Sequence, residues 1–255
     1  MAETLIQLSR ISKRYGAQAA LDGVDLAVGE GEFVALVGGS GSGKTTLLKT
    51  INGLISPDAG RVAVAGEDVA AAEPHLLRRR IGYVFQEVGL FPHLTVAENI
   101  AITPKLLGWD AGRMAARVAA LLELVALPPA VSGRAPAELS GGQRQRVGVA
   151  RALAAEPALM LMDEPFGALD PVTRDALGAE YRALHERLGL TTVMVTHDMA
   201  EAVLLADRIV VLDHGRILAD GAPADLLAFT QDPNVRALLE APKRQAERLQ
   251  ERLGA

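Results

Sequence analysis

A glycine-rich stretch with one lysine and two threonines, Gly38–Thr46, holds the residues best suited to chemistry in this sequence. It follows the apolar run Phe33–Val37, which predicts a buried strand, and precedes Leu47–Ile51, which predicts the start of a helix. The glycines let the backbone curl so that successive N–H groups face one anion, and the helix N-terminus adds its positive dipole end. The spacing Gly-x4-Gly-Lys-Thr in this context predicts a nucleoside triphosphate site.

The loop offers different groups for different parts of that ligand. We expect Lys44 to reach the β- and γ-phosphates and the Thr45 hydroxyl to bind Mg²⁺. The remaining predicted nucleotide contacts of the loop are Gly38, Gly39, Ser40, Gly41, Ser42, Gly43 and Thr46. The alternative is a glycine-rich turn with a solvated lysine, which would make the match of both spacing and context a coincidence.

Two adjacent carboxylates, Asp163 and Glu164, follow the apolar run Ala158–Met162. Ligands of parallel sheets bind at the carboxyl ends of the strands, so Asp163 is placed to hold Mg²⁺ directly or through water. Glu164 could orient and deprotonate an attacking water. The alternative is a turn with two solvated acids.

The stretch Leu139–Gln143, Leu-Ser-Gly-Gly-Gln, is a second candidate anion site. Ser140 can cap the helix that follows, and Gly141 and Gly142 leave backbone N–H groups free at its N-terminus. A single phosphate loop has no need of a second anion site in its own chain. An ordinary capped helix is the alternative.

The segments expected to position these residues predict an α/β fold with two additions. Strand-like segments with tight turns, Leu5–Tyr15, Leu21–Val28 and Arg61–Ala65, predict an antiparallel sheet beside the nucleotide core. Strand–helix–strand alternation over Ala158–Leu212 predicts a parallel sheet covered on both faces. A mostly helical stretch, from about Gln86 to Pro157, predicts a separate lobe. Helix starts are expected after the capping residues Thr95, Asp110, Asp170 and Asp198.

Composition narrows the class of protein. The chain has 255 residues, of which 49% are hydrophobic, enough for one large core with a smaller lobe. A net charge of −5 gives no support to nucleic acid as a partner. The absence of cysteine excludes disulfides, thiol catalysis and cysteine metal sites. The start Met1–Thr4 lacks signal-peptide character, and no apolar run approaches the ~18–20 residues of a spanning helix. Any action at a membrane is therefore expected to go through a partner.

Together these motifs resemble those of the ABC-transporter ATPases over about Leu5–Leu227. Leu139–Gln143 resembles the signature motif of that family. The other landmarks occur in the family's order: Gln86 after Ile81–Phe85 as the Q-loop glutamine, Ala168–Asp170 as the D-loop, His197 after Thr191–Thr196 as the switch histidine, and Tyr15 as the aromatic that stacks on adenine. The resemblance implies a P-loop NTPase core with a parallel sheet, an antiparallel β subdomain and a helical subdomain.

The resemblance also implies how the motifs work. Such domains pair head to tail, and each ATP lies between the phosphate loop of one chain and Ser140–Gly142 of the other. Gln86 would sense the γ-phosphate or bind Mg²⁺, and His197 would hold the γ-phosphate and the attacking water. With Lys44 and Glu164, His197 makes the expected catalytic set. The resemblance adds Tyr15, Gln86, Ser140, Gly141, Gly142, Gln143 and Asp170 to the nucleotide-binding residues, and makes Thr45, Gln86 and Asp163 the metal-binding ones.

Three stretches, Val88–Ile100, Pro104–Trp109 and Met162–Arg174, resemble more closely the ATPases of glycine betaine, choline and carnitine importers. This implies an ATP-hydrolysing subunit of a bacterial importer for a quaternary-ammonium osmoprotectant, peripheral to the cytoplasmic face of the cell membrane. Its expected partners are a second copy of the chain, integral-membrane permease subunits and, indirectly, a solute-binding protein. Leu90, Phe91 and Leu94 could line a groove for a permease helix or pack inside the helical lobe.

The chain also departs from the family pattern. Gly39 stands where proline is usual, a change that the loop should tolerate. We expect an ATP-binding domain over residues 1–230, with the helical subdomain at about 87–157, and a short helical tail over 231–255 without an appended regulatory domain. The alternatives are an importer ATPase for another solute, a non-transport soluble ABC ATPase, and a P-loop kinase or GTPase switch, which would leave Ser140–Gly142 without a role.

Overall fold

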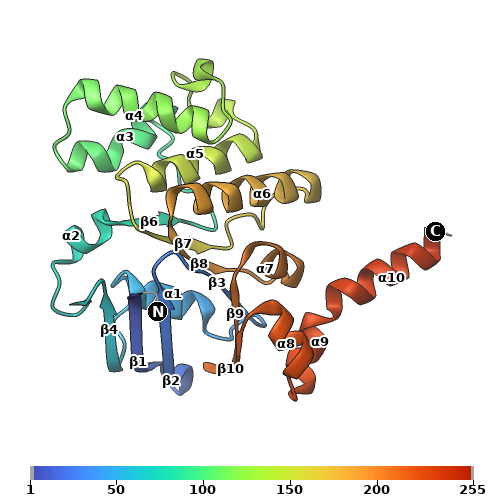
Figure 1. Ribbon diagram of the computed structural model, residues 1–255. Coiled ribbons are helices and arrows are strands. Elements are labelled where there is room, and N and C mark those ends of the chain that lie inside the picture. The colour runs from blue at the N-terminus through green and yellow to red at the C-terminus, as the bar shows by residue number, and fades with distance from the viewer. Residues whose placement is uncertain (1–2, 254–255) are drawn as a thin grey trace.

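The computed structural model describes residues 3–253 and contains two sheets (Figure 1). The central sheet has the strand order β10-β9-β3-β8-β7-β6. Strands β9, β3, β8, β7 and β6 run parallel, and β10 pairs antiparallel with β9. The bounds are β3 Phe33–Val37, β6 Ile81–Val84, β7 Leu159–Asp163, β8 Thr191–Val195, β9 Arg208–Asp213 and β10 Arg216–Gly221. The predicted parallel sheet is confirmed.

The second sheet has the order β2-β1-β4-β5, and its pairs are antiparallel. Its strands are β1 Thr4–Tyr15, β2 Gln18–Gly29, β4 Ala59–Val64 and β5 Glu67–Asp68. Strand β1 mixes buried apolar residues (Leu5, Ile6, Leu8 and Ile11) with exposed polar ones, as expected where one face is packed and the other is solvated, and irregular pairing interrupts strict alternation. The predicted antiparallel subdomain is therefore also confirmed.

The central sheet is packed on both faces, which explains why β3, β7 and β8 are apolar runs without alternation. Phe33, Ala35 and Val37 enter one core cluster together with residues of helices α3 to α7. Val34 and Leu36 enter the other, with helix α1 and the antiparallel sheet. Figure 1 shows this division, with α3, α4 and α5 on one side of the central sheet and α1 on the other.

The helices begin where the sequence predicts capping. Thr95 accepts from the Glu98 backbone N–H at 3.2 Å and Asp110 from that of Arg113 at 2.9 Å. Each such bond satisfies a donor that the first helical turn leaves free. The bounds are α1 Lys44–Ile51, α2 Pro74–Arg79, α3 Val96–Leu106, α4 Ala111–Leu124, α5 Gly141–Leu153, α6 Pro171–Leu188, α7 Met199–Leu205, α8 Pro223–Phe229, α9 Pro233–Leu239 and α10 Ala241–Leu253, with short 3₁₀ turns at Pro129–Val131 and Pro136–Glu138.

The segment after β9 contains two elements that the sequence did not predict, β10 and α8, and the expected helical tail of 231–255 is divided into two helices, α9 and α10. Helix α9 places Val235 and Leu239 in the same core cluster as Leu226 of α8. Helix α10 follows, as expected for a helical tail, and projects away from the rest of the chain (Figure 1). The outermost ends of the expected units 1–230 and 231–255, residues 1–2 and 254–255, lie outside the described residues. Within 3–253, every helix is too short or too polar to cross a bilayer.

Candidate active site

The loop between β3 and α1 takes a conformation that two of its glycines make possible. Gly38 has φ +149° and Gly43 has φ +107°, backbone angles that residues with a side chain rarely adopt. A Cβ at Gly38 would lie 2.1 Å from the Leu212 carbonyl oxygen, and one at Gly43 would lie 2.3 Å from that of Ala20. A Cβ at Gly39 would meet nothing within 4 Å. The loop therefore requires glycine at its two ends and has room beside Gly39.

Lys44 folds back over this loop. Its ammonium group donates to the carbonyl oxygens of Gly38 at 2.8 Å and Gly39 at 2.7 Å, and to the Ser42 hydroxyl at 3.2 Å. Only 6% of the residue is exposed. Burial lowers the pKa of Lys44, and the carboxylates of Glu164 and Asp163 oppose that shift. The cation is thus held inside the loop that is predicted to bind phosphates.

Thr45 and Asp163 meet across the site. The Thr45 hydroxyl donates to the Asp163 carboxylate at 2.9 Å, which joins the start of α1 to the end of β7. Asp163 is 5% exposed. Among residues 3–253 no group of three acidic or histidine side chains converges to hold a metal ion. Two oxygen donors suit Mg²⁺, which takes few protein ligands and completes its shell with water and phosphate oxygens.

Glu164 is the point where the catalytic candidates converge. Its Oε2 accepts from the Gln86 side-chain amide at 3.3 Å and lies 3.2 Å from Nδ1 of His197. The three residues follow β7, β6 and β8, which are neighbours in the sheet. Glu164 has φ +46°, an uncommon conformation for a residue other than glycine. Such backbone strain is concentrated at functional sites.

The Leu139–Gln143 segment lies apart from this cluster. Ser140 accepts from the Gln143 backbone N–H at 3.2 Å, and the Gln143 side chain accepts from the Ser140 N–H at 3.0 Å, so a capping box opens α5. Helix α5 belongs to one core cluster and α1 to the other, on opposite faces of the sheet. Within residues 3–253 no hydrogen bond joins 38–46 to 139–143.

The other two expected nucleotide contacts, Asp170 and Tyr15, lie on different elements, before α6 and at the end of β1. Asp170 caps α6, accepting from the Thr173 backbone N–H at 3.0 Å. A Cβ at Gly142 would lie 3.0 Å from the Thr173 methyl carbon, so the starts of α5 and α6 are side by side. Tyr15, at the end of β1, is 53% exposed, with the Lys13 ammonium 5.8 Å from its ring centroid. More than half of Tyr15 is thus exposed, and the Lys13 ammonium lies over its ring.

The apolar residues of the segment after Gln86 differ in which of two roles they fit, packing inside the helical lobe or lining a groove. Leu90 packs against the core, whereas Phe91 is 43% exposed. Phe91 lines a groove of about 240 Å³ between α2, β6, α3 and α5. The buried Asn99 holds the segment, donating to the Phe91 carbonyl at 3.1 Å and accepting from its N–H at 2.8 Å. Arg151 donates to the Val88 carbonyl at 2.6 Å.

Two residues near the site have surroundings that no sequence motif marked. Tyr83 has a buried hydroxyl beside Asp163, and burial together with that carboxylate raises its pKa, so the phenol stays neutral. Arg174 contacts the loop that follows Glu164. These residues come from strands and helices whose apolar pattern says nothing about what a polar side chain will meet. An inward-facing position on a predicted strand was the only available signal for Tyr83.

Comparison with known proteins agrees with this geometry. The family model for the ABC transporter matches residues 21–167. The chain is 51% identical over 224 residues to the glycine betaine/carnitine/choline transport ATP-binding protein of Bacillus subtilis (strain 168), covering 88% of this chain and 59% of that protein. It is 49% identical over 232 residues to the glycine betaine uptake system ATP-binding protein of Escherichia coli (strain K12), covering 91% and 75%. The chain thus spans about three fifths of the length of the Bacillus relative.

Relatives with other named solutes have similar identity. A sulfate/thiosulfate import ATP-binding protein of Caulobacter vibrioides is 50% identical over 227 residues, covering 86% of this chain and 65% of that protein. Among solved structures, a dimeric ATP-binding cassette in a post-hydrolysis state bound to ADP and Pi superposes with a TM-score of 0.78 at 34% identity, covering 86% of this chain and 98% of that one.

Proposed function

Because the chain belongs to the ABC transporter family, we propose that it is the ATP-hydrolysing subunit of a bacterial importer. The observation that carries this proposal is the position of Glu164, whose carboxylate is within hydrogen-bonding distance of both Gln86 and His197. A general base works best where neighbouring groups hold its side chain in a fixed orientation. A loop that only binds phosphate needs no such arrangement.

In this proposal Lys44, Glu164 and His197 have separate roles in the hydrolysis of ATP. The phosphates enter the loop between β3 and α1, and Lys44 exchanges its carbonyl partners for phosphate oxygens. Glu164 takes the proton of a water whose oxygen attacks the γ-phosphorus. The bond from that phosphorus to the bridging oxygen breaks, which leaves ADP and phosphate. His197 holds the γ-phosphate and the water in line, so the reaction starts from a near-attack geometry.

Thr45 and Asp163 are the protein ligands that we propose for Mg²⁺. Their oxygen atoms are 2.9 Å apart and belong to two different elements, so a cation between them would bridge α1 and β7. Mg²⁺ bound there would neutralise charge that develops on the phosphate oxygens. Gln86 would join this set through its side-chain amide and report the state of the site to the helical subdomain.

The site is completed by a second copy of the chain in this proposal. Ser140, Gly141 and Gly142 offer a hydroxyl and free N–H groups at the start of α5, the arrangement that binds anions. That helix packs on the face of the sheet opposite α1, so the same chain's loop cannot easily use it. A solved relative of this fold is a dimer bound to ADP and Pi, which supports the arrangement.

A permease subunit is the second partner that we propose, docked in the groove beside Phe91. The groove is lined by Tyr83, Phe85 and Phe91, which come before and after Gln86 in the chain, so an occupant would touch the segment that carries Gln86. Phe85 and Phe91 are large apolar side chains that remain exposed. An amphipathic helix of a membrane partner would bury them. In this proposal the chain lies at the cytoplasmic face of the membrane, with a solute-binding protein as an indirect partner.

We propose a quaternary-ammonium osmoprotectant, such as glycine betaine, choline or carnitine, as the solute. Relatives named for these solutes support it at 49–51% identity. The sulfate/thiosulfate relative at 50% identity favours sulfate as the second candidate, since a subunit that never touches the solute has little reason to differ between them.

Uptake in cells that lack this chain separates the two solutes. We expect deletion to abolish uptake of labelled glycine betaine, choline or carnitine, and to leave sulfate uptake unchanged. Restoring the wild-type chain should restore uptake, and restoring a Glu164→Gln chain should not. Loss of sulfate uptake with normal uptake of all three amines would contradict the proposed solute class, and unchanged uptake of every solute would contradict transport.

A further inference from the structure

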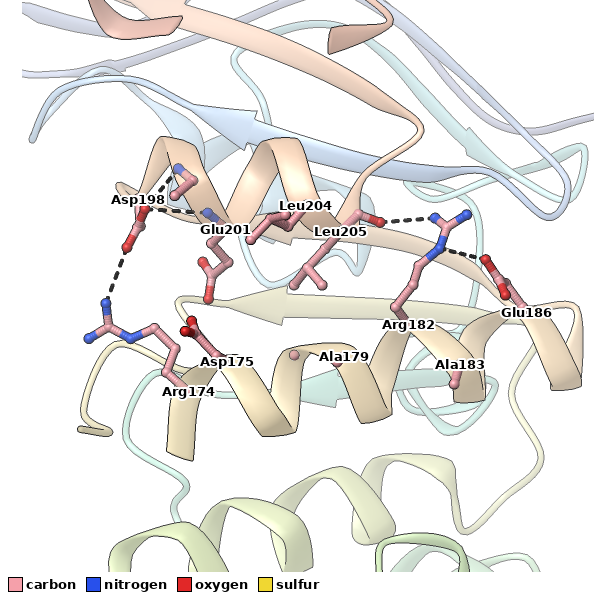
Figure 2. Close-up of a pocket in the computed structure, with 12 residues that line it drawn as sticks. Arg174, Asp175, Ala179, Arg182, Ala183, Glu186, Asp198, Glu201, Leu204 and Leu205 are labelled. Carbon is pink, nitrogen blue, oxygen red and sulfur yellow. Dashed lines mark hydrogen bonds and ion pairs between the residues drawn. The ribbon is translucent and has the colours of Figure 1, made fainter. Parts of the chain in front are cut away.

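Arg174, in the first turn of α6, joins two turns that both lead to the proposed active site. Its Nη1 donates to the Asp198 carboxylate at 3.2 Å, and its Nη2 donates to the Leu169 carbonyl oxygen at 3.2 Å. Leu169 belongs to the loop that runs from Glu164 to α6, and Asp198 directly follows His197. Figure 2 shows Arg174 reaching from α6 to Asp198 at the start of α7.

Both partners are themselves fixed in place. The other oxygen of Asp198 caps α7, accepting from the backbone N–H of Ala200 at 2.9 Å and of Glu201 at 3.3 Å. Leu169 donates its N–H to the Phe166 carbonyl at 3.1 Å. Because each partner sits in a tight turn, a shift of the guanidinium would move a whole turn instead of one side chain.

The Arg174 guanidinium is largely withdrawn from water. Its side chain is 25% exposed, and its Nε is buried without a hydrogen-bond partner among the residues that the structure describes. A planar guanidinium can serve two acceptors at once in a fixed geometry, which an ammonium group cannot. An unpartnered buried donor is a feature that native proteins rarely keep without a reason.

We propose that Arg174 is a positioning residue for hydrolysis. Its guanidinium fixes the loop that follows Glu164 relative to the turn that carries His197, so that the base and the histidine reach the same phosphate and water. Arg174 itself contacts neither the phosphate nor the water. The inference rests on the proposed ATPase function, because it concerns two of the side chains assigned to that reaction.

The chain contains a matched comparison on the same helix. Arg182, about two turns further along α6, donates to the Leu205 carbonyl at 2.9 Å, to Asp207 at 2.7 Å and to Glu186 at 2.9 Å. The two arginines stand at opposite ends of a groove of about 380 Å³ between α6 and α7 (Figure 2). Both tie α6 to α7 by the same chemistry, but the partners of Arg182 lead away from the active site, toward β9.

Replacing each arginine by glutamine in the full chain tests the proposal. We expect Arg174→Gln to lower kcat for ATP by about 10- to 100-fold, the range that a displacement of reacting groups by an ångström can cause. The KM for ATP and the affinity for Mg-ADP should stay within about twofold of wild type, because only the reaction step loses its geometry. Arg182→Gln should lower the melting temperature to a similar extent and leave kcat within about twofold.

A purely structural role predicts a different pattern. Equal losses of kcat in the two variants, in proportion to their losses of melting temperature, would overturn the proposal. So would a wild-type kcat in Arg174→Gln, or a defect confined to nucleotide affinity. If Arg174→Gln does not fold, Arg174→Lys tests the same proposal in its place. Its ammonium keeps the charge but lacks the planar fork of two Nη atoms that reaches both partners, so we expect an intermediate kcat.

The ion pair itself is tested with Asp198→Asn, which keeps a capping oxygen for α7 and removes the charge. Asp198→Asn should lower kcat, and the double variant with Arg174→Gln should lose no more than Arg174→Gln alone, as coupled residues do. Additive losses would overturn the proposed brace. A wild-type chain without ATPase activity would instead overturn the proposed function, so the two failures are distinguishable.

Discussion

A Glu164→Gln chain should bind ATP with wild-type affinity and hydrolyse it about 10²- to 10⁴-fold more slowly, the range attributed to general base catalysis. Glutamine has the shape of glutamate and keeps an oxygen that can accept from Gln86. It cannot take a proton from water. The loss should therefore appear in kcat, as a stopped hydrolysis step after normal binding.

The measurement is steady-state ATP hydrolysis paired with calorimetric titration of ATP. Glu186→Gln is the control, because Glu186 is an exposed residue of α6 that pairs with Arg182 at 2.9 Å, away from the site. Its turnover should match wild type. A Glu164→Gln chain that hydrolyses ATP at the wild-type rate would refute the assignment of the base.

The second large effect is expected from Lys44→Ala, in the affinity for nucleotide. A hydrogen bond to a charged group contributes about 1.5–3 kcal/mol, equivalent to a loss of affinity of about 10- to 150-fold. The lysine gives up its bonds to the Gly38 and Gly39 carbonyls when phosphate binds, so the lower part of that range is the better expectation. Stability should change little, because alanine also removes a buried cation.

Titration of Mg-ATP into Lys44→Ala and into Lys49→Ala measures this effect. Lys49 lies in the last turn of the same helix, beyond the phosphate loop. Its replacement should therefore leave the affinity for Mg-ATP unchanged. Equal affinity of the wild type and Lys44→Ala would show that the ammonium group does not contact the phosphates, contrary to the proposed site.

The sequence was sufficient for the elements that carry a strong local pattern. The apolar runs of β3, β7 and β8, the glycine-rich loop and the capping residues Thr95, Asp110 and Asp170 all lie where they were predicted. Each of these signals comes from neighbours in the chain, because burial on both faces, positive φ and a free N–H group are local requirements.

Strand β10, helix α8 and the division of the expected helical tail into α9 and α10 had no such signal. Helices α8 and α9 have seven residues each, fewer than the two or three turns over which an apolar face becomes recognisable. Strand β10 is an edge strand without a continuous apolar run, and it exists because β9 beside it offers unpaired backbone groups. Their formation depends on tertiary contacts, which local sequence does not encode.

The site shows the same limit. Glu164 was identified from its place after a strand, and Gln86 and His197 from the resemblance to the ABC-transporter ATPases, each one separately. That one oxygen of Glu164 would meet both of the others depends on the strand order β8-β7-β6, which no local pattern specifies. The contacts of Arg174 could not be predicted from the sequence either, because an arginine in a first helical turn is ordinarily solvated.

The central claim is that one copy of the chain supplies only part of each hydrolytic site, and the crystal structure of the Glu164→Gln chain with Mg-ATP tests it most directly. The distance to measure runs from the γ-phosphate to the Ser140 hydroxyl of each copy. We predict a two-copy assembly in which Ser140 of the opposite copy is within hydrogen-bonding distance of a γ-phosphate held by Lys44 of the first. A triphosphate enclosed by a single copy, with both Ser140 hydroxyls remote from it, would contradict the account.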